Sequence, residues 1–519
     1  MRQEIIHKLQ NFRTSLHRLF IKRADALFNL LDALSRDGHQ FKSVVELSQS
    51  VSFERSYNSI TDGITRGLLH TDFKKTERLV FDHTRAEKGK PHLFFTDCTA
   101  NPRPFAKVMQ ERGIVHSPNP APGNKPICVG HQYSLLAMSP KGERSKKGRW
   151  LIPISMKRVA LNEKGNETGV HQVVEMIKEL GIEDELCINT GDSLYGSEGC
   201  RKEAVLQKNL VQMFRLSNKR KLYQTPEYDK VQRPGRRKLF GDKVILSNPS
   251  THPKPDAVET VSMTTKKGKT YQVELTFFKN LLIRGSKDFA SQEHPLNVVK
   301  AIVTDDCGVA VFKRPLWIAV IGERKDEVSP KMAYDTYLNR YDIEHFFRFG
   351  KQKLLLDSYQ TPEVTHEEEW WRFVPLAYVQ LYLANQLSDL LPKPWERYLP
   401  NYKNPDGKSG LEKTPSQTQR AFANILEVIG TPAAPSVPRG RPTGRVTGTV
   451  IDKREPQTIH FKSLLPPTAS KKSDSSSSGN VDKKPNTNDI DRILSRLKFD
   501  LKNLGLSQNE FIERLISSG

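Results

Sequence analysis

The sequence predicts a mixed α/β protein with a helical N-terminal part and a tail that does not fold. Ile5, Leu9, Phe12 and Leu16 recur at helical spacing near the start of the chain. From about residue 91, short runs of strand-forming residues alternate with helical patterns. Beyond about residue 430 the composition shifts to Pro, Gly, Ser and Lys, which cannot bury enough apolar surface to fold.

The N-terminal part is predicted to be helical and to bind DNA. Its apolar stripe is surrounded by Lys8, Arg18 and Lys22, a pattern that also fits an amphipathic helix with a solvated basic face. The segment FKSVVELSQSVSFERSYNSITDGITRGL, residues 41 to 68, allows two short helices with a break between them. This is compatible with a helix-turn-helix, although ordinary short helices remain an alternative.

The middle of the chain predicts a sheet with covering helices. Leu93, Phe94 and Phe95 form a short apolar strand that ends at Asp97. The strands ICVGHQYSLLAM and RWLIPISM follow, and apolar residues at helical spacing between 170 and 180 mark a helix. LCINTGDSLYG then predicts a strand and a turn, and NLVQMFRL a further strand. His131, alone in its strand, is expected to be structural.

A β-rich insertion is predicted next, from the alternating segments TYQVELTFF, NVVKAIVT and AVFKRPLWIAVIG. Residues 215 to 243 hold ten Lys or Arg against three acids, and include Arg236, Arg237 and Lys238. Such a run can be a solvated surface or can follow a phosphate backbone. We take these three residues as candidate DNA contacts.

The tail carries two further features. Pro438-Arg439-Gly440-Arg441-Pro442 resembles the core of an AT-hook, which lies in a narrow minor groove. The last residues resemble a small helical hairpin. The predicted boundaries are 1–90, helical DNA-binding domain; 91–218, first part of the catalytic core; 219–312, β-rich insertion; 313–386, second part of the core; 387–430, helical extension; 431–487, disordered basic linker; and 488–519, helical hairpin.

The net charge of +22 indicates a polyanionic partner. DNA or RNA is the simplest one, and a membrane surface is the weaker alternative. No apolar run approaches the roughly 20 residues that span a bilayer, and the start of the chain lacks the apolar core of a signal peptide. We therefore expect a cytoplasmic protein. Its five cysteines show no zinc-site spacing and are expected to be reduced.

The segment YLNRYDIEHFFRFGK predicts a helix with one charged face. Tyr337, Arg340, Glu344, Arg348 and Lys351 fall within a narrow arc of such a helix, opposite its other aromatic residues. The simplest interpretation is a solvated face with an ordinary ion pair between residues four apart. The alternative is a face that carries chemistry.

Carboxylates on three separate elements favour that alternative. Asp97 and Asp192 follow predicted strands, and Glu344 lies on the charged helix face. Each alone can be a turn residue or a surface ion pair. Together, the order of strand, two strands, helix, strand and a later helix is that of a ribonuclease H-like core, where three such acids are neighbours and can hold two Mg²⁺ ions. Asp305 and Asp306 are the alternative to Asp192.

The spacing Tyr337-x2-Arg340-x3-Glu344-x6-Lys351 resembles the Tyr-Arg-Glu-Lys signature of DDE transposases from bacterial insertion sequences that cut through hairpin intermediates. Asp97-Cys98-Thr99 resembles their first acidic motif, and the likeness spans roughly residues 91 to 386. It implies a ribonuclease H-like fold and cut-and-paste transposition with two Mg²⁺ ions, for which Mn²⁺ can substitute. It also implies that Asp97, Asp192 and Glu344 are the metal-binding catalytic residues.

The same resemblance implies that Tyr337, Arg340 and Lys351 contact DNA phosphates, with Arg348 a weaker candidate. The partner would be double-stranded DNA, at the element ends and at the target, bound by a homodimer in the bacterial nucleoid. Two alternatives stay open: a DNA-binding protein that has lost cutting, and a ribonuclease H-like nuclease that cuts without recognising element ends.

Overall fold

The computed structural model describes residues 2–116, 126–143, 149–226, 238–264, 269–286, 288–391, 398, 412–437, 446–448, 450 and 453–460. The chain divides into two compact units. The first comprises Met1–Thr99 and Gln132–Thr449, and the second comprises Ala100–His131 and Val450–Gly519. Arg236, Arg237, the AT-hook-like segment and the expected C-terminal hairpin lie outside the described residues.

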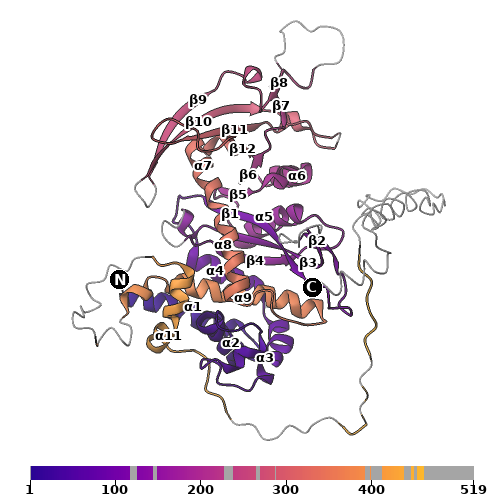
Figure 1. Ribbon diagram of the computed structural model, residues 1–519, viewed down its shortest axis with the longest axis vertical. Helices are drawn as coiled ribbons and strands as arrows, with labels where there is room; N and C mark the ends of the chain where they lie inside the picture. The colour runs from indigo at the N-terminus through magenta and orange to yellow at the C-terminus, as the bar shows by residue number, and fades with distance from the viewer. Residues whose placement is uncertain are drawn as a thin grey trace, which may run out of the picture. The chain divides into compact units, whose positions relative to one another are not determined.

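The N-terminal part of the first unit is helical, as predicted (Figure 1). It contains α1 (Arg2–Leu19), α2 (Ala24–Asp37) and α4 (Phe73–Thr84). The segment from 41 to 68 has helical residues on either side of a break, as expected, but they do not form two regular α-helices. The 3₁₀ helix η1 (Val45–Gln49) precedes the break, and α3 (Asn58–Asp62), the π-helical η2 (Gly63–Gly67) and the start of η3 (Leu68–His70) follow it. Serines and glycines, which are weak helix formers, interrupt this segment.

The predicted core sheet is present in the first unit. Its strands are β1 (His92–Pro102), β3 (Ile127–Met138), β4 (Ile152–Arg158), β5 (Cys187–Gly191) and β6 (Leu210–Leu216). They lie side by side in the order β4-β3-β1-β5-β6, and β1, β5 and β6 are parallel. The helices α5 (Gly165–Leu180) and α6 (Glu198–Leu206) precede β5 and β6. This large mixed sheet is consistent with a ribonuclease H-like fold.

The β-rich segment continues the same sheet beyond β6. The strand β12 (Leu316–Ile321) pairs with β6, and β11 (Leu296–Thr304), β10 (Thr270–Leu281) and β9 (Ala257–Thr264) follow, each antiparallel to its neighbour. A separate ribbon is formed by β7 (Lys221–Tyr223) and β8 (Lys243–Ile245). The connection between β11 and β12 begins with a turn, because Asp305 Oδ1 accepts from the N–H groups of Cys307 and Val309.

The helix expected across 337–351 is in fact two helices, α7 (Pro330–Asn339) and α8 (Asp342–Lys353). At the junction, the N–H groups of Arg340 and Ile343 bond to carbonyls three residues earlier instead of four. This tighter turn changes which residues share a face. Tyr337 is only 1% exposed, whereas Glu344 is exposed, although a continuous helix would align them.

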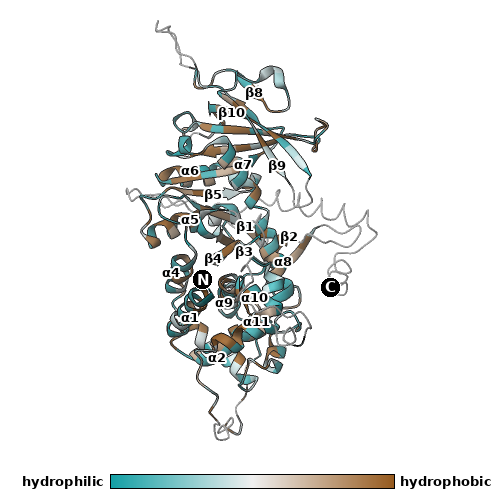
Figure 2. Cartoon of the chain, turned by 90° about the vertical axis from the view of Figure 1, so that its left-hand side faces the viewer, coloured by the Kyte–Doolittle hydropathy of each residue, from teal (hydrophilic) through white to brown (hydrophobic). Residues whose placement is uncertain are grey.

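The long helix α9 (Val364–Ala384) joins the helical part to the sheet. It packs against α1, α2, α11 (Pro415–Ile429) and β4. The ring of Trp371 stacks on Tyr133 with centroids 4.1 Å apart. Figure 2 shows hydrophobic residues along the strands and helices that meet in this core, with polar residues over the outer helix surfaces.

Buried Arg13 adds a polar tie between the same helices. Its guanidinium donates to Asp32 at 2.6 and 2.9 Å, to Gln380 at 2.5 Å and to the carbonyl of Gly430 at 3.1 Å. The helices α1, α2 and α9 and the end of α11 therefore meet at one buried ion pair.

The second unit contains β2 (Gly113–His116), which pairs antiparallel with Ile127 to Gly130. The guanidinium of Arg112 donates to backbone carbonyls from Arg103 to Met109. His131 is buried, with its Nε2 3.0 Å from the carbonyl oxygen of Gln110, consistent with a structural role.

All five cysteines are unpaired. Among the helices that the structure describes, none is both long and apolar enough to cross a membrane.

Candidate active site

Asp97 lies on β1 just beyond the pairing of this strand with β5. That parallel pairing extends to Phe95, opposite Thr190, after which the strands diverge. The strand itself continues to Pro102, so Asp97 lies within it and not at its end as predicted. The side chain of Asp97 is 25% exposed, and its Oδ1 accepts from the N–H of Cys98 at 2.8 Å.

Asp192 follows β5 directly and begins the short helix η5 (Ser193–Gly196). Its Oδ1 accepts from the N–H of Leu194 at 2.7 Å, a helix cap that holds the carboxylate at the end of the strand. Gly191 makes this turn possible. A Cβ at Gly191 would lie 2.2 Å from Cγ of the buried ring of Tyr195.

Glu344 lies in the first turn of α8 and is exposed. Its neighbours Ile343 and Phe346 are 0% and 1% exposed. The helix therefore packs on its apolar face and presents Glu344 on the other, as its sequence pattern predicts.

The charges of Asp192 and Glu344 both act on Asp97. Burial raises the pKa of Asp97 above its usual value, and the charges of Asp192 and Glu344 raise it further. Arg340 and the N–H of Cys98 oppose this rise. Because both other acids act on Asp97, the fold brings together residues from β1, from the end of β5 and from α8.

Arg340 lies between the carboxylates and Tyr337. Its Nη1 donates to Asp97 Oδ2 at 3.3 Å. Burial lowers the pKa of Arg340, but Asp97, Tyr337 and Asp192 more than offset this effect, so its pKa lies above the usual value. Burial also raises the pKa of Tyr337, whose side chain is hydrogen-bonded to Arg340. The Nε of Arg340 is buried and has no hydrogen-bond partner among the described residues.

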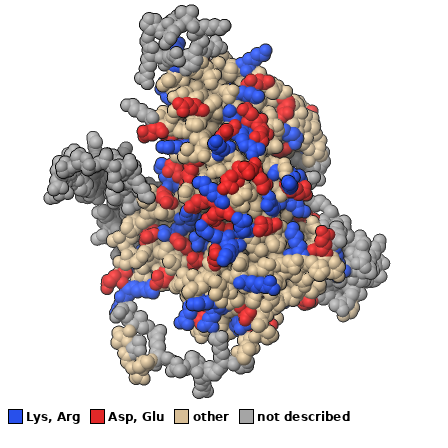
Figure 3. Space-filling model, turned by 180° about the vertical axis from the view of Figure 1, so that it is seen from behind, with Lys and Arg blue, Asp and Glu red and all other residues tan. Residues whose placement is uncertain are grey.

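The other basic candidates differ in their surroundings. Burial lowers the pKa of Lys351, which Asp357 partly counteracts, and Arg348 is exposed on the same helix. Lys238 is exposed near the start of β8. Figure 3 shows Lys and Arg interspersed with Asp and Glu on the face seen there, so on that face the excess positive charge does not form one uniform basic surface.

The carboxylate oxygens of the site are suitable ligands for a hard divalent cation. Carboxylate oxygens are the ligands that Mg²⁺ prefers, and mutual repulsion of the acids at Asp97 would be relieved by a cation. In the described part of the chain, however, no group of three or more His, Cys, Asp or Glu side chains is close enough to hold a metal ion. Oxygens of Asp97 and Asp192 are instead engaged by Arg340 and by the N–H of Leu194.

Three residues beside the site were not among the sequence candidates. The charge of Arg215 on β6 lowers the pKa of Tyr337. Arg215 could have been noticed as the one charged residue of the strand LVQMFRL. Cys98 follows Asp97 in β1, and its Sγ lies 4.0 Å from the phenol oxygen of Tyr195. Burial raises the pKa of the Cys98 thiol to about 12. Their pattern in the sequence carries no comparable signal.

Comparison with known protein families assigns the chain to a family. The model of the DDE superfamily endonucleases matches residues 15–276, about half of the chain. The chain belongs to this family, which implies an enzyme that cleaves DNA, and members of the family typically use divalent metals. The match includes Asp97 and Asp192 and ends before Glu344. No curated protein matches the sequence.

Proposed function

We propose that this protein is a transposase of an insertion sequence and that it catalyses metal-dependent cut-and-paste transposition. The observation that supports the proposal is that the charges of Asp192 and Glu344 both raise the pKa of Asp97. Family membership supports DNA as the substrate. The spacing of Tyr337, Arg340, Glu344 and Lys351 supports the hairpin-forming group.

The acids and the basic residues take separate roles in this proposal. Asp97, Asp192 and Glu344 would hold two Mg²⁺ ions. These ions would activate a water nucleophile and neutralise charge that develops on the phosphate. Arg340 can offer its guanidinium, which here pairs with Asp97, to a phosphate. Tyr337, which is only 1% exposed, accepts a hydrogen bond from Arg340, and Lys351 and exposed Arg348 supply positive charge further along α8.

The chemistry proceeds by phosphodiester exchange. Water attacks the phosphorus at the element end, the P–O3′ bond breaks, and a 3′-OH and a 5′-phosphate form. The 3′-OH then attacks the opposite strand, which closes a hairpin and releases the 3′-OH of the flanking DNA. Hydrolysis reopens the hairpin, and the freed 3′-OH attacks target DNA. Each step breaks one P–O bond and forms one, so no external energy source is needed.

Cleavage of DNA that carries the gene and its flanks tests the proposal. The full chain is incubated with this DNA in Mg²⁺, in Mn²⁺ or in chelator, and the products are resolved on a denaturing gel. Glu344→Gln removes a carboxylate without changing side-chain size. Glu323→Gln is the matched control, because Glu323 is an exposed acid outside the site.

The expected result is metal-dependent cutting at both flanks with hairpin-sized products, lost in Glu344→Gln and retained in Glu323→Gln. Cutting that does not depend on the flanking sequences would show that the protein is a nuclease and not a transposase. Binding of DNA without any metal-dependent cutting would indicate a DNA-binding derivative.

A further inference from the structure

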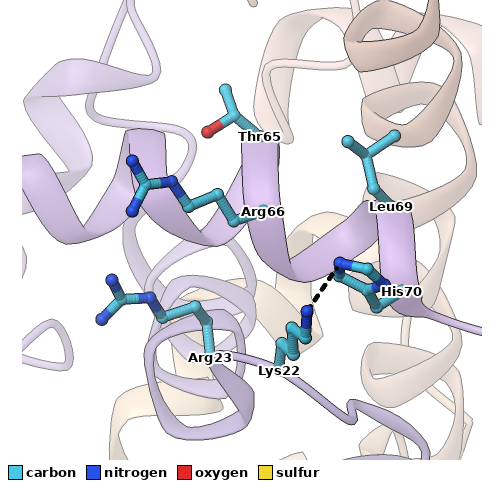
Figure 4. Close-up of a pocket in the computed structure, with 6 residues that line it drawn as sticks. All are labelled: Lys22, Arg23, Thr65, Arg66, Leu69 and His70. Atoms are coloured by element: carbon cyan, nitrogen blue, oxygen red, sulfur yellow. Dashed lines mark hydrogen bonds between the residues drawn. The ribbon is translucent and has the colours of Figure 1, made fainter.

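A basic pocket lies in the helical N-terminal part, apart from the carboxylates. It has a volume of about 470 Å³ and is lined by Lys22, Arg23, Thr65, Arg66, Leu69 and His70 (Figure 4). Four of these residues carry basic side chains. The turn between α1 and α2 contributes Lys22 and Arg23, and the turns η2 and η3 contribute the others.

Unusual backbone geometry brings these two segments together. Arg23 has a φ of 57° and lies in the left-handed region, which L-residues rarely adopt. Gly67 permits the close approach, because a Cβ there would lie 2.9 Å from the carbonyl oxygen of Lys22. The segment that ends at Gly67 is a π-helical turn, a distortion that frequently marks functional sites.

The cations around the pocket are only partly neutralised. Asp62 receives a hydrogen bond from Arg23 at 2.7 Å, but its contact with Arg66 is 3.9 Å and the Arg66 side chain is 70% exposed. Lys22 Nζ lies 3.0 Å from His70 Nε2, and this contact does not neutralise the charge of Lys22 because histidine carries no negative charge. In Figure 4 the guanidinium groups of Arg23 and Arg66 extend to the same side. The pocket therefore presents several cations, of which Arg23 and Arg66 share the carboxylate of Asp62.

The chemistry and size of the pocket point to one ligand class. Clustered Arg and Lys side chains offer charge-assisted hydrogen bonds to a phosphate. A volume of about 470 Å³ lies in the range of pockets that take whole small molecules, so it has room for more than a bare inorganic phosphate. A phosphodiester with its flanking sugars meets both requirements.

We infer that this pocket binds a backbone phosphate of DNA and is a second contact point, separate from the carboxylates. The inference rests on the proposed function for the identity of the polyanion. Lys22 and Arg66 supply the charge, and Arg23 is held in place by Asp62. The interaction is independent of base sequence, because phosphates carry no sequence information.

The salt dependence of DNA binding tests the inference. Affinity of the full chain for a labelled duplex is measured by fluorescence anisotropy over a series of salt concentrations. The test variant is Lys22→Ala/Arg66→Ala, with Lys22→Gln/Arg66→Gln as a second version that removes the charge but keeps a polar side chain. Lys75→Ala/Lys88→Ala is the matched control, since it removes two exposed lysines of the same helical part outside the pocket.

Removal of the pocket cations should weaken binding several-fold. It should also make the plot of log affinity against log salt shallower by about one for each phosphate that the protein no longer neutralises. The control should lose less affinity and keep its slope. Circular dichroism and the thermal midpoint would establish that every variant is folded. If the pocket variants matched the control while wild-type protein still bound and cut DNA, the pocket inference would be wrong and the proposed function would stand.

Inorganic phosphate provides the second arm. If wild-type protein bound no DNA, the proposed function and the DNA ligand would both fail. A rise in thermal midpoint with phosphate, absent from the pocket variants, would then identify the pocket as a site for a free phosphate and overturn its assignment to DNA.

Discussion

The guanidinium of Arg340 lies 3.3 Å from the carboxylate of Asp97, across 243 positions of the chain. A cation from the α7–α8 junction thus neutralises the acid that β1 contributes to the candidate site. In doing so it opposes the effects of burial and of Asp192 and Glu344 on the pKa of Asp97. The same guanidinium is a candidate for binding DNA phosphate, so phosphate and Asp97 would compete for it.

Replacing Arg340 should lower the stability of the folded protein at neutral pH, because Asp97 loses its cation. In Arg340→Ala the pKa of Asp97 rises further, because its neutralising cation is gone. When the pKa of a carboxyl is higher in the folded than in the unfolded protein, where it is about 3.9, the folded protein loses stability as pH rises between these two pKa values. We expect a loss of about 1–3 kcal/mol at pH 7 that shrinks in acid. Denaturant unfolding at several pH values measures this, and Arg340→Lys should lose less.

Asp97→Asn should have the opposite effect on stability. The raised pKa shows that the folded protein favours the neutral form, so a neutral amide of the same shape should stabilise the metal-free protein by about 1 kcal/mol at pH 7. This gain should shrink as pH falls below the folded pKa and vanish below the unfolded value of about 3.9, where Asp97 is protonated in both states. DNA cutting should be abolished. A variant that was inactive and also less stable at pH 7 would contradict this account of Asp97.

Gly191→Ala should damage the site from behind. The new Cβ would lie 2.2 Å from Cγ of Tyr195, so the ring or the backbone beside Asp192 must move. Overpacking of this kind costs about 1–3 kcal/mol. We expect a lower thermal midpoint. We also expect at least a tenfold loss of cutting, because even a small displacement of a catalytic carboxylate slows the reaction strongly. Tyr195→Phe, which keeps the ring, is the control, and an unperturbed Gly191→Ala would show that the turn can adapt.

Arg13→Ala should loosen the helical part from α9. It leaves Asp32 as a buried charge without its cation, which costs about 3–5 kcal/mol. The double variant Arg13→Ala/Asp32→Ala should recover part of this loss, because no lone charge remains. Urea unfolding of the wild type, both single variants and the double variant measures the coupling. Purely additive losses would show that the ion pair does not join these helices.

Glu77 should make stability depend on pH away from the site. Burial raises the pKa of this α4 carboxyl to about 7, while a hydrogen bond from Ser155 and the charge of Arg372 lower it. Stability should therefore fall as pH rises from about 4.5 to about 7. Glu77→Gln should add on the order of 3 kcal/mol at pH 8 and only a few tenths near pH 4.5.

Much of the local structure could be predicted from residue patterns. The strands around Phe94, Leu135 and Val211 carry enough apolar and β-branched residues to be recognised without tertiary context. The exposed side of α8 at Glu344 and its buried side at Phe346 also follow from helical periodicity. The segment from 41 to 68 was predicted less well, because a helical pattern does not distinguish an α-helix from a series of 3₁₀ and π turns.

Taken by itself, the sequence determined the periodicity of the elements and the identity of the acids that are candidates for the site. It could not determine the partners of these acids. Only the tertiary structure decided that Arg340 pairs with Asp97 and that Tyr337 is buried, since one tightened turn between α7 and α8 redirects both. The physical reason is that periodicity is local, whereas burial and Coulomb interaction depend on distances between residues far apart in the chain.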